Sequence, residues 1–177
     1  MSLAYATKSN QVAAALRDTL REHLADQIPP EYEGGPDGGR LYLPAALVPP
    51  LHDNYLLQSG AATMRANLCP AICIDDKGST QEEAYVGGTN LVEYKFDVEI
   101  WDQQRGAEDG RERINAWRDA IEACLDAEWT CREAVALCET ESSDPAFAAK
   151  LDSNVLWIGV VHVRTLCYIG RGEPALT

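Results

Sequence analysis

The chain has few basic residues and no long apolar run. Its 177 residues include 15 Lys and Arg against 28 Asp and Glu, a formal net charge of −13. Neutralising nucleic-acid phosphates needs clustered Lys and Arg, so the composition argues against capture of DNA or RNA by a basic patch. No segment reaches the roughly 20 apolar residues of a membrane-spanning helix, and nothing near Met1 resembles a signal peptide. We therefore expect a soluble protein made in a cytoplasm, without a membrane partner.

Motifs for catalysis and cofactor binding are also missing. There is no Gly-x-Ser-x-Gly elbow, no phosphate loop with Gly-Lys-Ser/Thr, no Gly-x-Gly-x-x-Gly after a strand and no His-Glu-x-x-His. The only histidines are His23, His52 and His162. His162 falls inside a predicted strand, which is more typical of a structural residue than of a general base. We expect no enzymatic activity, no catalytic residue and no cofactor; a small cytoplasmic enzyme using His162 or a cysteine stays an alternative.

The six cysteines are interpreted as reduced and structural, since cytoplasmic thiols stay reduced. Four bulky or thiol side chains recur every seven residues and would form one stripe on a continuous helix: Trp117, Cys124, Cys131 and Cys138. Free cysteine packs as a small hydrophobe, so a buried stripe explains the spacing. A zinc site including Cys69 and Cys73 is a weaker alternative, because this Cys-x-x-x-Cys pair has no second close pair. We expect no metal.

Length and hydrophobic content predict one domain over residues 1–177 with a single core, since 46% of the residues are hydrophobic. Ser9 is a candidate cap for a first helix, which Pro29 and Pro30 end near Ile28. One side of this helix carries apolar residues spaced by four: Val12, Leu16, Leu20 and Leu24.

A Gly- and Pro-rich insertion follows at 31–67. It is too apolar for a disordered linker and too interrupted by proline for a long regular element. We expect it to contact an adjacent subunit or partner, with packing on its own domain as the alternative. Its candidate interface residues are Leu41, Tyr42, Leu43, Leu47, Val48, Leu51 and Tyr55.

The segment 91–102 has the strongest strand pattern in the chain. Tyr94, Phe96, Val98 and Ile100 alternate with charged residues, which predicts one face beneath the helices and one polar face. The residues expected on the polar face are Glu93, Lys95, Asp97, Glu99 and Trp101. Water is the ordinary reason for a polar face; an aqueous channel or a charged partner is the other.

Further elements predict an α+β domain with a mainly antiparallel sheet flanked by two principal helices. A short strand is expected at 71–75, followed by a polar loop and a possible extension at 84–86. The second helix is expected at 111–127. For 131–141 the periodicity fits helix or strand, and we favour a strand at 134–138. The run 155–169 is rich in β-branched residues, as in a central strand.

The order of these elements over residues 8–170 resembles that of the tail terminator and tail-completion (neck) proteins of tailed bacteriophages. The resemblance rests on six features in order: a capped first helix ending at Ile28-Pro29, a Gly- and Pro-rich excursion, a small strand at 70–75, a long alternating strand ending at Trp101-Asp102, an amphipathic helix at 111–127 and a long final strand. The insertion at 31–67 departs from the usual pattern of that family, which leaves the subunit interface open.

The resemblance implies a structural protein of the virion that forms a ring, usually a hexamer. Such a ring caps the tail tube, contacts neck or connector proteins and lets DNA pass without specific binding. Glu93, Lys95, Asp97 and Glu99 are then candidates to face the lumen, and Trp101 joins the residues of the insertion as an interface candidate. Other neck, head-closure or tail-tube components remain alternatives.

Overall fold

The computed structural model describes residues 8–27, 69, 71–85, 89–103, 109–151 and 154–170. In chain order its elements are helix α1 (Lys8–His23), the 3-10 helix η1 (Leu24–Gln27), strands β1 (Ala71–Tyr85) and β2 (Thr89–Gln103), helix α3 (Asp109–Ala127), and strands β3 (Leu137–Leu151) and β4 (Asn154–Gly170).

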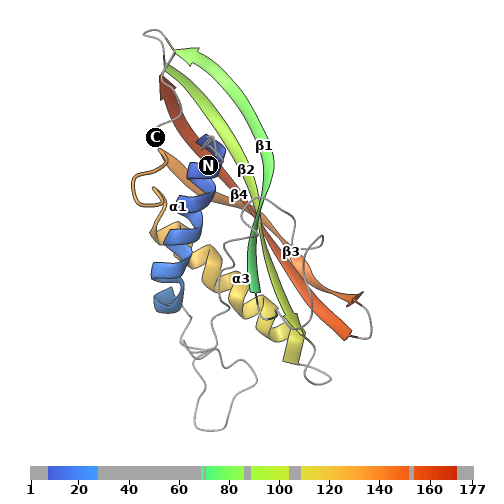
Figure 1. The fold of residues 1–177 in the computed structure, drawn as a ribbon. Helices are drawn as coiled ribbons and strands as arrows, with labels where there is room; N and C mark the ends of the chain where they lie inside the picture. Colours follow the sequence, from blue (N-terminus) through green and yellow to red (C-terminus); the bar gives the residue numbers. More distant parts are fainter. Residues whose placement is uncertain are drawn as a thin grey trace, which may run out of the picture.

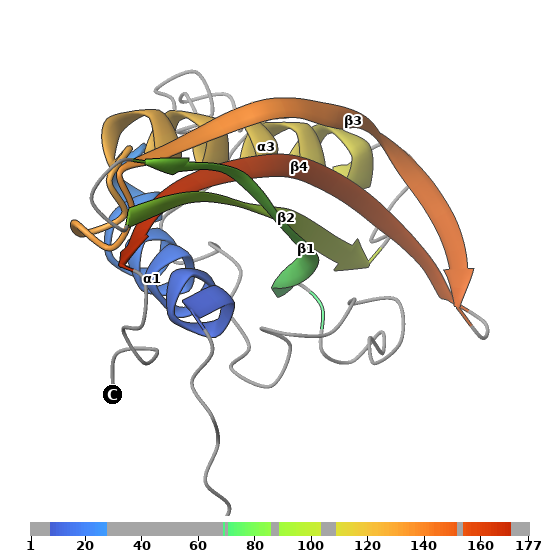
Figure 2. The same ribbon diagram turned by 90° about the horizontal axis from the view of Figure 1, so that it is seen from above.

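The four strands form one sheet in the order β1-β2-β4-β3, with every neighbouring pair antiparallel. Both helices lie on the same side of this sheet (Figure 1), and the strands curve strongly along their length (Figure 2). The expected α+β class, with an antiparallel sheet and two principal helices, is confirmed. The insertion at 31–67 lies outside the described residues.

The main core fills the space between the sheet and the helices. Tyr94, Phe96, Val98 and Ile100 of β2 are buried there, as the alternation in the sequence predicts. Their partners in the same cluster include Leu16 and Leu20 of α1 and Trp117 and Ile121 of α3. The other side chains of β2 consequently point away from the helices.

The stripe of four residues spaced by seven does not lie on one helix, so this interpretation was wrong. α3 ends at Ala127, and three residues of the following turn, Cys131, Arg132 and Glu133, have φ of 45°, 62° and 65°. A run of left-handed residues cannot continue a right-handed helix. Cys131 nevertheless lies in the main core, together with Cys138 of β3.

Both edge strands are longer than the sequence predicts. β1 continues through the polar residues expected to form a loop, and pairs with β2 as far as Tyr85. β3 begins at Leu137 rather than residue 134 and runs to Leu151. Each edge strand has two register shifts: near Lys77 and Glu82 in β1, and near Glu141 and Pro145 in β3. Such bulges break the alternation of polar and apolar residues by which strands are predicted.

Candidate functional site

The sheet surface turned away from α1 and α3, here called the open face, is the candidate functional site. It carries the alternate residues of β2 from Glu93 to Trp101, and none of the described helices packs against it. The open face divides into a charged region and an apolar end.

A row of ion pairs crosses the charged region from one edge of the sheet to the other. On β1, Lys77 Nζ lies 2.6 Å from Asp75 Oδ2, and it also lies 3.1 Å from Asp97 Oδ2 on β2. Asp97 Oδ1 lies 2.7 Å from His162 Nδ1 on β4. His162 Nε2 is 3.5 Å from Asp144 Oδ2 on β3. This transverse row therefore links all four strands through side chains.

The row favours the charged form of its basic members. Burial lowers the pKa of His162, but the hydrogen bond and charge of Asp97, with smaller effects from Asp144, outweigh it, so the pKa lies above its ordinary value. The hydrogen bond to Asp75 is the main cause of a raised pKa at Lys77. Protonation of His162 lets both ring nitrogens donate, one toward each carboxylate.

A second set of ion pairs lies beside the first. Arg164 of β4 donates from Nε to Glu93 Oε2 at 2.7 Å and from Nη1 to Glu139 Oε1 at 2.6 Å, and these two hydrogen bonds raise its pKa. Lys95 Nζ lies 3.3 Å from Glu141 Oε1 and 3.4 Å from Glu93 Oε1. β2 is thus tied to β3 across the intervening β4.

When Glu99, which lies beside the two networks, is counted with them, carboxylates outnumber cations. The acidic members are Asp75, Glu93, Asp97, Glu99, Glu139, Glu141 and Asp144, and the basic ones are Lys77, Lys95, Arg164 and His162. With His162 neutral, this part of the described surface has an excess of four negative charges. An approaching polyanion is repelled by such a surface.

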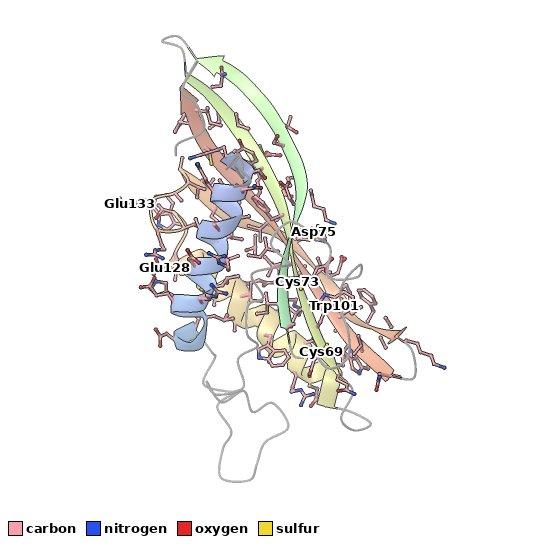
Figure 3. All side chains as sticks on the ribbon, in the orientation of Figure 1. Cys69, Cys73, Asp75, Trp101, Glu128 and Glu133 are labelled. Carbon is pink, nitrogen blue, oxygen red and sulfur yellow. The ribbon has the colours of Figure 1, made fainter. Side chains whose placement is uncertain are left out.

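The opposite end of the open face is apolar. A small cluster, separate from the main core, contains Ala71, Cys73, Trp101, Leu156, Ile158 and Val160. Trp101 belongs to this cluster, and its Nε1 donates to Glu99 Oε2 at 3.1 Å. In Figure 3, Trp101 lies near Cys73 at this end of the sheet.

Beside the cluster the surface is hollowed. The hollow has a volume of about 360 Å³ and is lined by Glu99, Trp101, Phe147, Ala149, Lys150, Ile158 and Val160. Phe147 stays 47% exposed, although it is a large apolar side chain. An apolar concavity with an exposed aromatic wall can receive a complementary apolar group.

The residues predicted to form the site differ in how far they are exposed to solvent. Glu93 and Glu99 are only 8% and 7% exposed, Asp97 is half-buried, and Lys95 is exposed. Trp101 lines the hollow. The remaining interface candidates lie in the insertion, outside the described residues.

Sequence reasoning missed the partners of these charges. Arg164, Glu139 and Asp144 come from β4 and β3, far along the chain from β2. His162 and Arg164 alternate with apolar residues in β4, and this spacing was the one signal that could have identified them as facing the same way.

All six cysteines are free thiols: Cys69 is half-buried and the others are buried. Burial, with a smaller contribution from Glu99, raises the pKa of Cys73 to about 12. Within the described ranges, no group of three or more His, Cys, Asp or Glu is placed to hold a metal ion. The helices among these residues are all too short or too polar to cross a membrane.

Two comparisons with known proteins were negative: the sequence matches no model of a protein family, and it matches no curated protein.

Proposed function

We propose that this chain is a structural ring subunit of a tailed-bacteriophage virion, at the tail terminator or tail-completion position. The ring caps the tail tube and joins it to the neck or connector, and DNA passes through it without specific binding. The observation that carries the proposal is the acidic open face, whose charges are held in place by the ion pairs across the sheet.

An acidic wall suits the passage of DNA. Carboxylates repel phosphates, while a wall of Lys and Arg would bind the duplex tightly and release counterions. Fixed positions matter as well, because Glu93 and Asp97 are each paired with basic partners and cannot reorganise freely around a moving polyanion. We therefore assign the open face to the lumen of the ring.

The mixed surface also suits assembly. The charged region and the apolar end lie on one face, so a subunit could present charge to the lumen and its apolar end to a neighbour. A hexamer with tail-tube and neck proteins as partners follows from the family resemblance. Another neck or tube component is the second candidate, since it would use the same acidic wall.

Assembly is tested by native mass spectrometry and electron microscopy of the purified chain at micromolar concentration. A closed ring, expected to contain six subunits, supports the proposal. A monomer at every concentration, with and without tail tubes, contradicts it.

The lumen assignment is tested by reversing charges on the open face. In the variant E139K/E141K/D144K the three changed residues lie on β3, whereas the control E22K/D26K/D126K makes the same change in net charge on the helical side. Only the ring of E139K/E141K/D144K should bind duplex DNA. The logarithm of its binding constant should fall linearly with the logarithm of salt concentration, with a slope of roughly −0.9 for each phosphate contacted. Equal binding by the control ring would show that the open face does not line the channel.

A further inference from the structure

The turn after α3 presents an exposed tryptophan on a firmly anchored backbone. Trp129 is 52% exposed. Its carbonyl oxygen accepts a hydrogen bond of 2.6 Å from Cys138 N, and Cys131 N donates to Glu128 O at 2.8 Å. Cys131 and Cys138 are both buried in the main core. The indole is thus presented at little cost in conformational entropy, because its supporting turn is already ordered.

The turn that carries Trp129 also contains residues in the left-handed backbone conformation. Cys131, Arg132 and Glu133 all have positive φ, which costs on the order of 1–2 kcal/mol for each such residue. Strained conformations of this kind persist where the surrounding structure determines them, and they concentrate at functional positions. An exposed tryptophan beside such a turn is a candidate anchor for a partner, since Trp is enriched among the residues that dominate binding energy.

The hollow on the open face is suited to receive an indole ring. Trp101, Phe147, Ile158 and Val160 give it apolar walls, and Lys150 lies at its lining. Figure 3 shows Glu128 and Glu133 on one side of the molecule and Trp101 on the other. Trp129 is 52% exposed and is not among the residues that line the hollow of its own chain.

We propose that Trp129 of one copy inserts into the hollow of a second copy of this chain. Charge complementarity selects this occupant, because Glu128 and Glu133 accompany the tryptophan and Lys150 is the exposed charge of the hollow. Glu99 also lines the hollow, but it is only 7% exposed and accepts a hydrogen bond from Trp101 Nε1. None of Glu128, Glu133 and Lys150 has an ion-pair partner within the described part of the chain. Insertion brings carboxylates toward an amino group and covers Phe147 at the same time.

The contact joins two different surfaces, so each copy offers one tryptophan and one hollow. Such a heterologous contact repeats from copy to copy, and it closes into a ring when the rotation between neighbours divides a full turn. Only the closure of this contact into a ring rests on the proposed function. The association itself is independent of any phage component.

Sedimentation equilibrium of the purified full chain measures the association. Trp129→Ala should weaken it by about 30-fold or more, as expected for removal of a central tryptophan anchor. Tyr168→Ala is the matched control, because it removes another exposed aromatic side chain, from β4, and should leave association unchanged. Thermal unfolding of each variant checks that the fold is kept.

Two combinations test the pairing itself. Lys150→Glu should weaken association, and the variant K150E/E128K/E133K should regain it, since the charges are exchanged between the two sides.

Mixing Trp129→Ala, which keeps an intact hollow, with Phe147→Asp, which keeps the tryptophan, should give 1:1 pairs that grow no further. Neither variant should form long assemblies alone.

The outcomes separate this interface from the ring function. Association unchanged by Trp129→Ala, or a charge exchange that restores nothing, overturns the inference, whereas rings that persist in that variant leave the proposed function intact. Trp129-dependent association that yields open chains supports the interface and contradicts the ring. Absence of self-association in the wild-type chain contradicts both.

Discussion

His162 should make the stability of this protein depend on pH. Its Nδ1 lies 2.7 Å from Asp97 Oδ1, and the side chains of His162 and Asp97 are 31% and 15% exposed. Hydrogen bonds to charged groups contribute about 1.5–3 kcal/mol, while exposed ion pairs contribute about 0.2–1 kcal/mol. For this partly buried pair we expect about 1 kcal/mol from protonation of the imidazole.

The sign follows from the direction of the pKa shift. The folded pKa is raised above the ordinary value, so the folded state binds the proton more tightly than the unfolded chain. The stabilisation is complete below the unfolded pKa of about 6.5. It is lost as the pH rises through the higher folded pKa.

His162→Gln provides the test, because glutamine can still donate to Asp97 but does not titrate. Urea unfolding of both proteins near pH 6 and near pH 8.5 brackets the transition. The free-energy difference between wild type and variant should be about 1 kcal/mol larger at the lower pH, or about 2–4 °C in Tm for a chain of this size. Asp97→Asn should flatten the same pH dependence, and His23→Gln serves as a control. A wild type and a His162→Gln variant with parallel pH profiles would refute this account of the transverse row.

Three further outcomes are expected. Gly159→Ala places a Cβ 2.5 Å from Ile114 Cγ2 and should destabilise the protein by about 1–3 kcal/mol in urea unfolding; an unchanged midpoint would mean that Ile114 relaxes freely. Gly78→Ala meets open space but a φ of 101°, so backbone strain alone should cost about 1–3 kcal/mol, and an unchanged Tm would contradict it. Alkylation of the native protein should modify half-buried Cys69 first and the five buried cysteines only on unfolding; early loss of Cys73 would show that this end of the sheet opens.

The sequence predicts the parts of the fold that alternate between water and the core. β2 and α3 are found where their periodicity indicates, because each has one apolar and one polar side. Beyond Asp75 in β1 and beyond Cys138 in β3, polar and apolar residues do not alternate in this way, so the sequence does not predict these parts of the strands. Both lie at edges of the sheet, where few side chains are buried, and their bulges shift the alternation. β3 also contains Pro145, and proline is tolerated in a strand at the edge of a sheet.

The candidate site is less predictable than the fold. The alternation in β2 identifies Glu93 and Asp97 as facing the same way, but it cannot show that Arg164 and His162 neutralise them. Those partners depend on the register between β2 and β4. The hollow depends on register too, since Trp101, Phe147 and Ile158 meet only when three strands are aligned.

The bulges at both edges also bear on how molecules of this chain can meet. An edge strand with an uninterrupted row of free N–H and C=O groups invites another strand to add to it, which is the route to fibrils. Here each edge is interrupted twice, with proline at residue 145 of β3. Over the described residues, only short stretches remain in which a foreign strand could pair in register. The two described edges are therefore protected from aggregation into continuous intermolecular sheets, even at high protein concentration.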